Sequence, residues 1–248
     1  MARKKKSLSA AVSKEIQSKF DLNAFKNKKG LDKNIKFKDQ EWIPLSKAFQ
    51  DVTSVPGIPM GHIVLLRGHS DTGKTTALIK AAVDAQKKGI LPVLIITEQK
   101  WGFEHAKLLG FDCEEVVDKT TGEIDWDGFF LFNNDFQYIE EITDYINSLL
   151  DAQDKGELEY DLLFLWDSVG SVPCKMTFEG KGGKMHNAAT LADKIGMGLN
   201  QRIGKSRRQD SKYTNTLVVV KGQGVVLNEP SVVAIVDNAG KKNVLAVG

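Results

Sequence analysis

Five short apolar segments recur along the chain, and stretches with helical periodicity separate them. The segments are apolar at both alternate positions, which is typical of strands buried on both faces. They span residues 62–67, 92–97, 129–132, 162–166 and 216–220. Apolar spacings of three and four predict helices over residues 74–88, 102–109, 138–150 and 187–205. The alternation predicts an α/β fold, with a mostly parallel twisted sheet flanked by helices.

A short amphipathic helix is predicted near the N-terminus. Its apolar stripe consists of Leu8, Ala11, Val12, Ile16 and Phe20. Residues 26–39 are rich in Lys and Asn, which favours a linker, and prolines and glycines over 56–61 precede the first strand. We therefore expect a basic N-terminal helix and linker over residues 1–45 and a core over residues 46–248.

Charge is distributed unevenly along the chain. The 248 residues carry a net charge of only +2, yet residues 1–38 hold 12 Lys and Arg against three acidic residues, a net +9 that leaves −7 for the rest. Such a basic segment attracts polyanions or an acidic neighbouring subunit, or it is a solvated tail. Charge composition alone does not decide between these.

Composition excludes several classes of protein. Apolar residues make up 42% and charged residues 27%, which argues against wholesale disorder. We expect neither a transmembrane segment nor a signal peptide, and so a cytoplasmic protein. Cys113 and Cys174 lie far apart in the sequence with no CxxC pattern, which predicts reduced thiols and no zinc site. Metal chemistry is expected to use oxygen ligands.

The clearest chemical motif follows the first core strand. Residues 68–75 match G-x-x-x-x-G-K-[ST], the phosphate loop of nucleotide-binding proteins. Its backbone N–H groups cradle phosphate oxygens, the lysine contacts the β- and γ-phosphates, and the hydroxyl binds Mg²⁺. The expected nucleotide-binding residues are Gly68, His69, Ser70, Asp71, Thr72, Gly73, Lys74, Thr75 and Thr76. Asp71 is unusual there, because a carboxylate repels phosphate unless it faces solvent.

Two carboxylates end other predicted strands. Asp167 follows the apolar segment 162–166, where an acid supports Mg²⁺ either directly or through water, although it could instead cap a helix. Glu98 follows residues 92–97 and is the candidate general base for the water that attacks the γ-phosphate, or a helix cap. Because ligands of such sheets bind at the carboxyl ends of strands, both acids are expected near the phosphate loop.

Two further segments have the composition of loops that contact nucleic acid. Residues 173–187 combine lysines and glycines with Met176 and Phe178, and residues 222–243 carry amides and lysines. Cations suit phosphate contacts and apolar side chains can wedge between bases, although ordinary surface loops look similar. The candidate DNA-binding residues are Lys175, Met176, Phe178, Lys181, Lys184, Gln223, Asn228, Lys241 and Lys242.

The order of these motifs resembles the RecA-type recombinases, including phage members of the UvsX kind. The similarity covers about residues 55–225 and rests on VPGIPMGHIVLLRGHSDTGKTT, TEQKWGFEHAKLLGFD, WDSVGSVP, GKMHNAATLADKIGMGLNQRI and NTLVVVKGQG. In this sequence the usual Asn-Gln pair after the last strand is replaced by Lys221-Gly222-Gln223. The resemblance rests on the order and spacing of the five segments together more than on any single segment.

The resemblance implies a RecA-like ATPase core that uses ATP and Mg²⁺. It implies a filament on single-stranded DNA that pairs with homologous duplex DNA, with ATP between protomers and the N-terminal helix on the adjacent subunit. Glu98 would be the catalytic glutamate, with Lys74 also catalytic, Thr75 and Asp167 would hold the metal, and Gln223 would sense the γ-phosphate.

Two alternatives remain open at this stage. A helicase-type ATPase with the same core would assemble as a hexameric ring. A RecA-like scaffold would bind ATP and DNA without useful hydrolysis, and Asp71 together with the altered sensor region keeps that reading open.

Overall fold

The computed structural model describes residues 35–69, 71–98, 101–117, 119, 122 and 124–221, together with the backbone of residues 233–238 and 241–247. Its contacts divide the chain into Met1–Phe37 and Lys38–Gly248, and the second unit is described here by itself. The predicted N-terminal helix, Ser70, Gln223 and Asn228 lie outside the described residues. Those expectations stay predictions.

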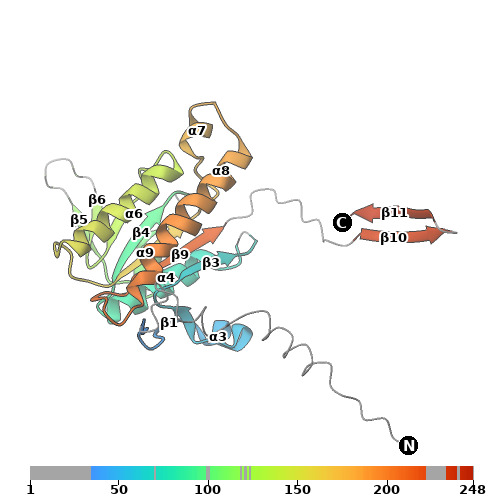
Figure 1. Ribbon diagram of the computed structural model, residues 1–248. Helices are drawn as coiled ribbons and strands as arrows, with labels where there is room; N and C mark the ends of the chain where they lie inside the picture. The colour runs from blue at the N-terminus through green and yellow to red at the C-terminus, as the bar shows by residue number, and fades with distance from the viewer. Residues whose placement is uncertain are drawn as a thin grey trace, which may run out of the picture. The chain divides into compact units, whose positions relative to one another are not determined.

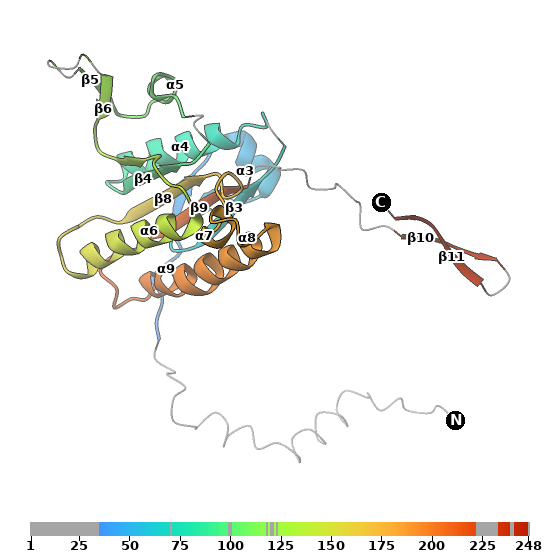
Figure 2. The same ribbon diagram turned by 90° about the horizontal axis from the view of Figure 1, so that it is seen from above.

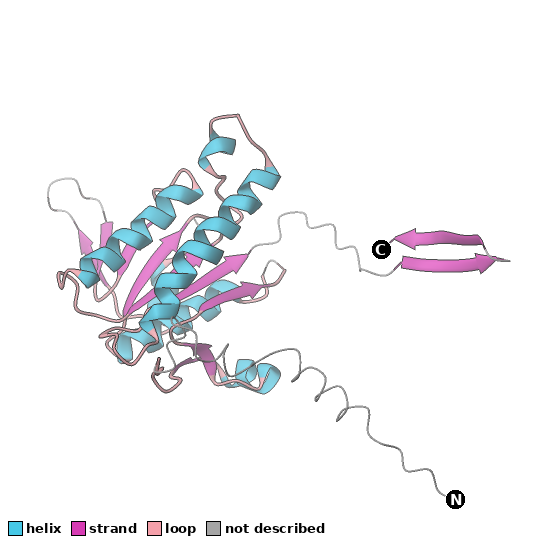
Figure 3. Ribbon diagram, in the orientation of Figure 1, coloured by secondary structure: helices cyan, strands magenta, loops and turns pink. Residues whose placement is uncertain are grey.

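The core of this unit is a five-stranded parallel sheet in the order β3-β9-β8-β4-β7. The strands are β3 (Ile63–Arg67), β4 (Leu91–Ile96), β7 (Leu131–Asn133), β8 (Leu162–Asp167) and β9 (Thr216–Lys221). Helices flank both faces (Figures 1 and 3). This confirms the predicted α/β fold, and it is the arrangement of a RecA-like core.

Alternate residues of the central strands supply two separate hydrophobic cores. On β8, Leu163 and Leu165 pack into the core with α4 (Lys74–Lys87), whereas Phe164 and Trp166 pack into the core with α6 (Ile139–Asp154) and α9 (Asn200–Ser206). Successive side chains of a strand point to opposite faces, so a strand covered on both sides must be apolar throughout. Figure 2 shows α4 on one side of the sheet and α6, α8 and α9 on the other.

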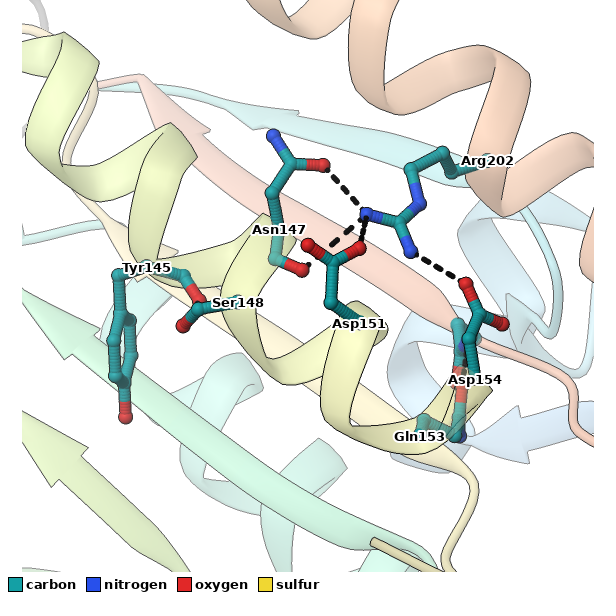
Figure 4. Close-up of polar contacts among 8 residues, drawn as sticks. Tyr145, Asn147, Ser148, Asp151, Gln153, Asp154 and Arg202 are labelled. Atoms are coloured by element: carbon teal, nitrogen blue, oxygen red, sulfur yellow. Dashed lines mark hydrogen bonds and ion pairs between the residues drawn. The ribbon is translucent and has the colours of Figure 1, made fainter. Parts of the chain in front are cut away.

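The predicted helix over residues 187–205 is longer and more complex than expected. It runs as α8 (Lys184–Leu191), a π-helical segment η1 (Ala192–Leu199) and α9. Arg202 of α9 connects this continuous helix to α6 (Figure 4). Its guanidinium donates to the Asn147 side chain and pairs with Asp151 at 2.7 Å and Asp154 at 2.8 Å. These contacts hold the helix formed by α8, η1 and α9 against α6 on one face of the sheet.

Several elements were not predicted from the sequence. They are β1 (Trp42–Pro44) paired with β2 (Gly57–Pro59), α3 (Lys47–Thr53), the hairpin of β5 (Glu114–Val117) and β6 (Ile124–Asp127), and the hairpin of β10 (Val233–Asn238) and β11 (Lys241–Val247). The second hairpin corrects the expectation that residues 222–243 form one loop, since part of that segment is β-strand. Lys241 and Lys242 begin β11, and their side chains lie outside the description.

The predicted helix over residues 102–109 is α5 (Phe103–Leu108). No helix in the part of the chain that the structure describes has the length and apolar character needed to cross a bilayer.

Candidate functional site

The phosphate-loop motif forms the connection between β3 and α4. Gly73 caps the helix with a φ of 82°, a left-handed conformation that suits glycine, and no side chain caps the helix N–H groups. At Gly68 a Cβ would come within 2.9 Å of the Thr72 hydroxyl, so a larger residue there would require the Thr72 side chain to shift. The loop therefore presents backbone N–H groups at the positive end of a 14-residue helix, which attracts anions.

Lys74 lies over this loop. Its ammonium donates to the carbonyl oxygens of Gly68 at 3.0 Å and His69 at 2.5 Å, and the Thr72 hydroxyl donates to the same His69 carbonyl at 2.8 Å. These contacts hold the Lys74 ammonium beside the phosphate loop, where it can pair with a bound anion. Asp71 is exposed to solvent with a φ of 60°, a conformation that aspartate tolerates better than most residues.

Asp167 ends β8 beside the first turn of α4. Its carboxylate is buried and accepts a hydrogen bond from the Thr75 hydroxyl at 2.8 Å. The two predicted metal ligands, 92 positions apart in the sequence, are thus in direct contact. Thr75 gives its single proton to Asp167, and the lone pairs of its oxygen remain as potential metal ligands.

Glu98 joins the same set through Ser168. The buried Ser168 hydroxyl donates to Oε1 of Glu98, and Ser168 directly follows Asp167, to which it is joined by a cis peptide bond. Thr97, one residue before Glu98, donates from its hydroxyl to the Ser168 carbonyl at 2.9 Å. The carboxyl ends of β4 and β8 therefore bring Glu98, Asp167 and the phosphate loop to one place, as expected for a parallel sheet.

The donor set at these strand ends fits a magnesium nucleotide. It offers one ammonium, one hydroxyl, one buried carboxylate and a helix N-terminus. Among the described residues, no group of three or more His, Cys, Asp or Glu could hold a metal by itself. Mg²⁺ is usually held by one or two protein oxygens together with substrate phosphates and water, so a sparse oxygen site suits it.

The predicted first DNA-binding loop contains secondary structure. Lys175, Met176 and Phe178 lie on the one-turn helix α7 (Lys175–Phe178), and Lys184 begins α8. Met176 and Phe178 are about half exposed. Lys181 pairs with Glu179 at 3.0 Å. This segment therefore displays cations and apolar side chains to solvent, as the composition predicted.

Contacts on its flanks anchor this segment. The backbone N–H of Lys175 donates to Glu140 of α6, and that of Cys174 donates to Asn187 of α8. The Lys175 ammonium lies 5.6 Å from the ring of Tyr138. Burial, reinforced by Glu141, raises the pKa of Tyr138 above its ordinary value. The segment is thus tied to both α6 and α8.

Sequence reasoning gave no role to Thr97, Ser168 or Ser171. The hydroxyls of Thr97 and Ser171 lie 2.5 Å apart and both contact the backbone carbonyl of Ser168, whereas the Ser168 hydroxyl donates to Glu98. A sequence signal did exist, since two of these residues directly flank Glu98 and Asp167. Hydroxyl residues are common at strand ends, so only their contacts in the structure connect these residues with Glu98.

Comparison with known proteins finds relatives that are named RecA. The protein named RecA from Francisella tularensis subsp. novicida is 31% identical over 239 residues, which is 92% of this chain and 56% of that protein. The RecA of Aquifex aeolicus is 34% identical over 117 residues, 47% of this chain and 32% of its own length. The chain is therefore similar to RecA proteins.

The similarity covers only part of the length of these RecA proteins. The chain spans between about a third and just over half of the length of these relatives, and the RecA of Nitrobacter winogradskyi gives the same picture at 34% identity over 115 residues. No protein-family model matches the chain. The relatives carry the name RecA, so the phage subtype stays a prediction.

Proposed function

We propose that this RecA-like chain is a DNA-dependent ATPase that binds single-stranded DNA as a filament and pairs it with homologous duplex DNA. The observation that carries the proposal is the contact between Thr75 and Asp167, with Glu98 joined to the same strand end through Ser168. This contact unites a phosphate loop with the two carboxylates that ATP hydrolysis needs.

Each residue has a proposed task. The N–H groups at the start of α4 and the Lys74 ammonium bind the phosphates, Thr75 and Asp167 hold the metal, and Glu98 orients the attacking water and accepts its proton. Bound Mg²⁺ would neutralise charge that develops on the phosphate oxygens. Gln223 is proposed to sense the γ-phosphate, on the resemblance alone.

The DNA contacts are proposed for the two segments identified in the sequence. Lys175, Lys181 and Lys184 would contact phosphates, while Met176 and Phe178 would contact bases. Exposure of the two apolar side chains supports this, because large apolar groups gain by being covered. Gln223, Asn228, Lys241 and Lys242 are proposed for the second segment on composition.

Filament formation, a cytoplasmic location and a phage origin complete the proposal and rest on the resemblance. The basic segment of residues 1–38 is proposed to bind the neighbouring subunit. Electron microscopy with single-stranded DNA and a slowly hydrolysed ATP analogue tests the assembly directly. Helical filaments are expected, and Lys74→Ala should abolish them. Closed six-membered rings would instead identify a helicase-type assembly.

A further inference from the structure

The hydroxyl of Ser168 has a single possible role toward Glu98. A carboxylate only accepts hydrogen bonds, so Ser168 must donate its one proton to Oε1. Ser168 is fully buried. Its backbone is also held, because the following N–H, that of Val169, donates to Val220 of β9 at 2.9 Å. The donor that contacts the proposed general base is therefore fixed on the sheet itself.

Two further hydroxyls converge on the carbonyl of Ser168. Thr97 donates to it at 2.9 Å, and Ser171 lies 2.6 Å from it and 2.5 Å from the Thr97 hydroxyl. Each hydroxyl has one proton, so Ser171 donates either to Thr97 or to the carbonyl itself. In both arrangements Ser171 and Thr97 fix the residue that contacts Glu98.

Ser171 connects this hydroxyl set to the first proposed DNA loop. It lies in the turn after β8, two residues before the segment 173–187 that displays the lysines. The N–H of Cys174 and the N–H of Lys175 anchor that segment to α8 and α6. A movement of the segment upon DNA binding would thus act on the turn that contains Ser171.

We propose that Ser168 is the positioning residue for Glu98, and that Ser171 and Thr97 make the orientation of Glu98 depend on the DNA-binding segment. The inference rests on the proposed ATPase function and adds a regulatory connection to it. General-base catalysis depends on alignment within a fraction of an ångström, so a modest rotation of the Glu98 carboxylate changes the rate.

Three alanine variants of the full chain, together with the conservative variant Ser171→Thr, test the proposal. Ser168→Ala removes the donor to Glu98, and Ser171→Ala removes an exposed hydroxyl whose loss should not impair folding. Ser148→Ala is the matched control, because Ser148 is a serine of α6 whose hydroxyl donates to the Tyr145 carbonyl. ATP hydrolysis is measured with and without single-stranded DNA, and kcat is separated from KM.

The expected kinetic pattern is specific. Ser168→Ala should lower kcat about tenfold with KM within about twofold, the range for losing a hydrogen bond to a charged group. Ser171→Ala should lower kcat more strongly with DNA than without, and Ser171→Thr should restore it. A loss confined to KM, or equal losses with and without DNA for Ser171→Ala, would overturn the proposal.

A second readout does not depend on hydrolysis. The ¹³C carboxyl resonance of Glu98, assigned by its disappearance in Glu98→Gln, should shift in Ser168→Ala and in Ser171→Ala but stay in place in Ser148→Ala. An unchanged resonance in both site variants would refute the positioning role. If the wild-type chain lacks ATPase activity, the proposed function fails, and this resonance still decides whether Ser168 positions Glu98.

Discussion

The Thr75 hydroxyl lies 2.8 Å from a carboxylate oxygen of Asp167 and joins the start of α4 to the carboxyl end of β8. Asp167 is buried, and burying a carboxylate is costly unless it is hydrogen-bonded or bound to a cation. The proposed magnesium site therefore includes this pair.

Replacing Asp167 tests that site. Asp167→Asn keeps the shape of the side chain but removes its charge, so we expect Mg²⁺-dependent ATP binding to weaken at least about tenfold. Calorimetric titration with ATP, at several Mg²⁺ concentrations, measures this. Asp84→Asn is the control, since Asp84 lies on α4 away from the phosphate loop in sequence and pairs with Lys87 at 3.3 Å. Equal Mg²⁺ dependence in both variants would contradict the assignment.

Replacing Glu98 separates binding from hydrolysis. Glu98→Gln should retain ATP affinity within a fewfold while slowing hydrolysis by about 100-fold or more, the usual contribution of a positioned general base. Glu104→Gln, at an exposed position on α5, should behave as wild type. Hydrolysis at the wild-type rate by Glu98→Gln would remove Glu98 from the mechanism.

The lysines of residues 173–187 should dominate the salt dependence of DNA binding. Each phosphate contact on a single strand contributes about 0.7 to the slope of log affinity against log salt, so replacing Lys175, Lys181 and Lys184 by Ala should reduce the slope by up to about 2. Fluorescence anisotropy with a labelled oligonucleotide gives the slope. The double variant of Lys87 and Lys88 to Ala, at the end of α4, provides the comparison. A slope that the triple variant leaves unchanged would exclude this segment from DNA contact.

Asn215 supports the opposite end of the sheet. This buried side chain accepts from the Leu162 N–H at 3.1 Å and exchanges two hydrogen bonds with Gln153 of α6. Asn215→Ala leaves buried polar groups without partners and should lower the free energy of unfolding by about 2–4 kcal/mol. Urea denaturation measures the loss, and Ser148→Ala should change stability by less than about 0.5 kcal/mol. A loss for Asn215→Ala no larger than that would mean that water replaces the network.

The sheet and the acidic residues at the carboxyl ends of its strands were predictable, because a strand buried on both faces has a continuous apolar sequence. Residues 162–166 are all buried, and the acid that follows them lies where a parallel sheet presents its ligands. The β5–β6 hairpin was not predictable in this way. Every residue of Glu114–Val117 is exposed, so no buried face imposes a pattern on that sequence.

The contacts among Thr97, Ser168 and Ser171 could not be predicted from the sequence for a different reason. Thr97 and Ser168 are neighbours only because β4 and β8 pair in a particular register, with Ile96 opposite Asp167. A shift of one residue would place both hydroxyls elsewhere. Helix boundaries also depended on packing, since α6 continues to Asp154, beyond the predicted end at residue 150.

The most direct test of the proposed function is steady-state ATP hydrolysis with and without single-stranded DNA, with Lys74→Ala as the blank. The account predicts turnover that single-stranded DNA stimulates and that disappears in Lys74→Ala. Turnover that ignores DNA, or that survives in Lys74→Ala, would contradict it.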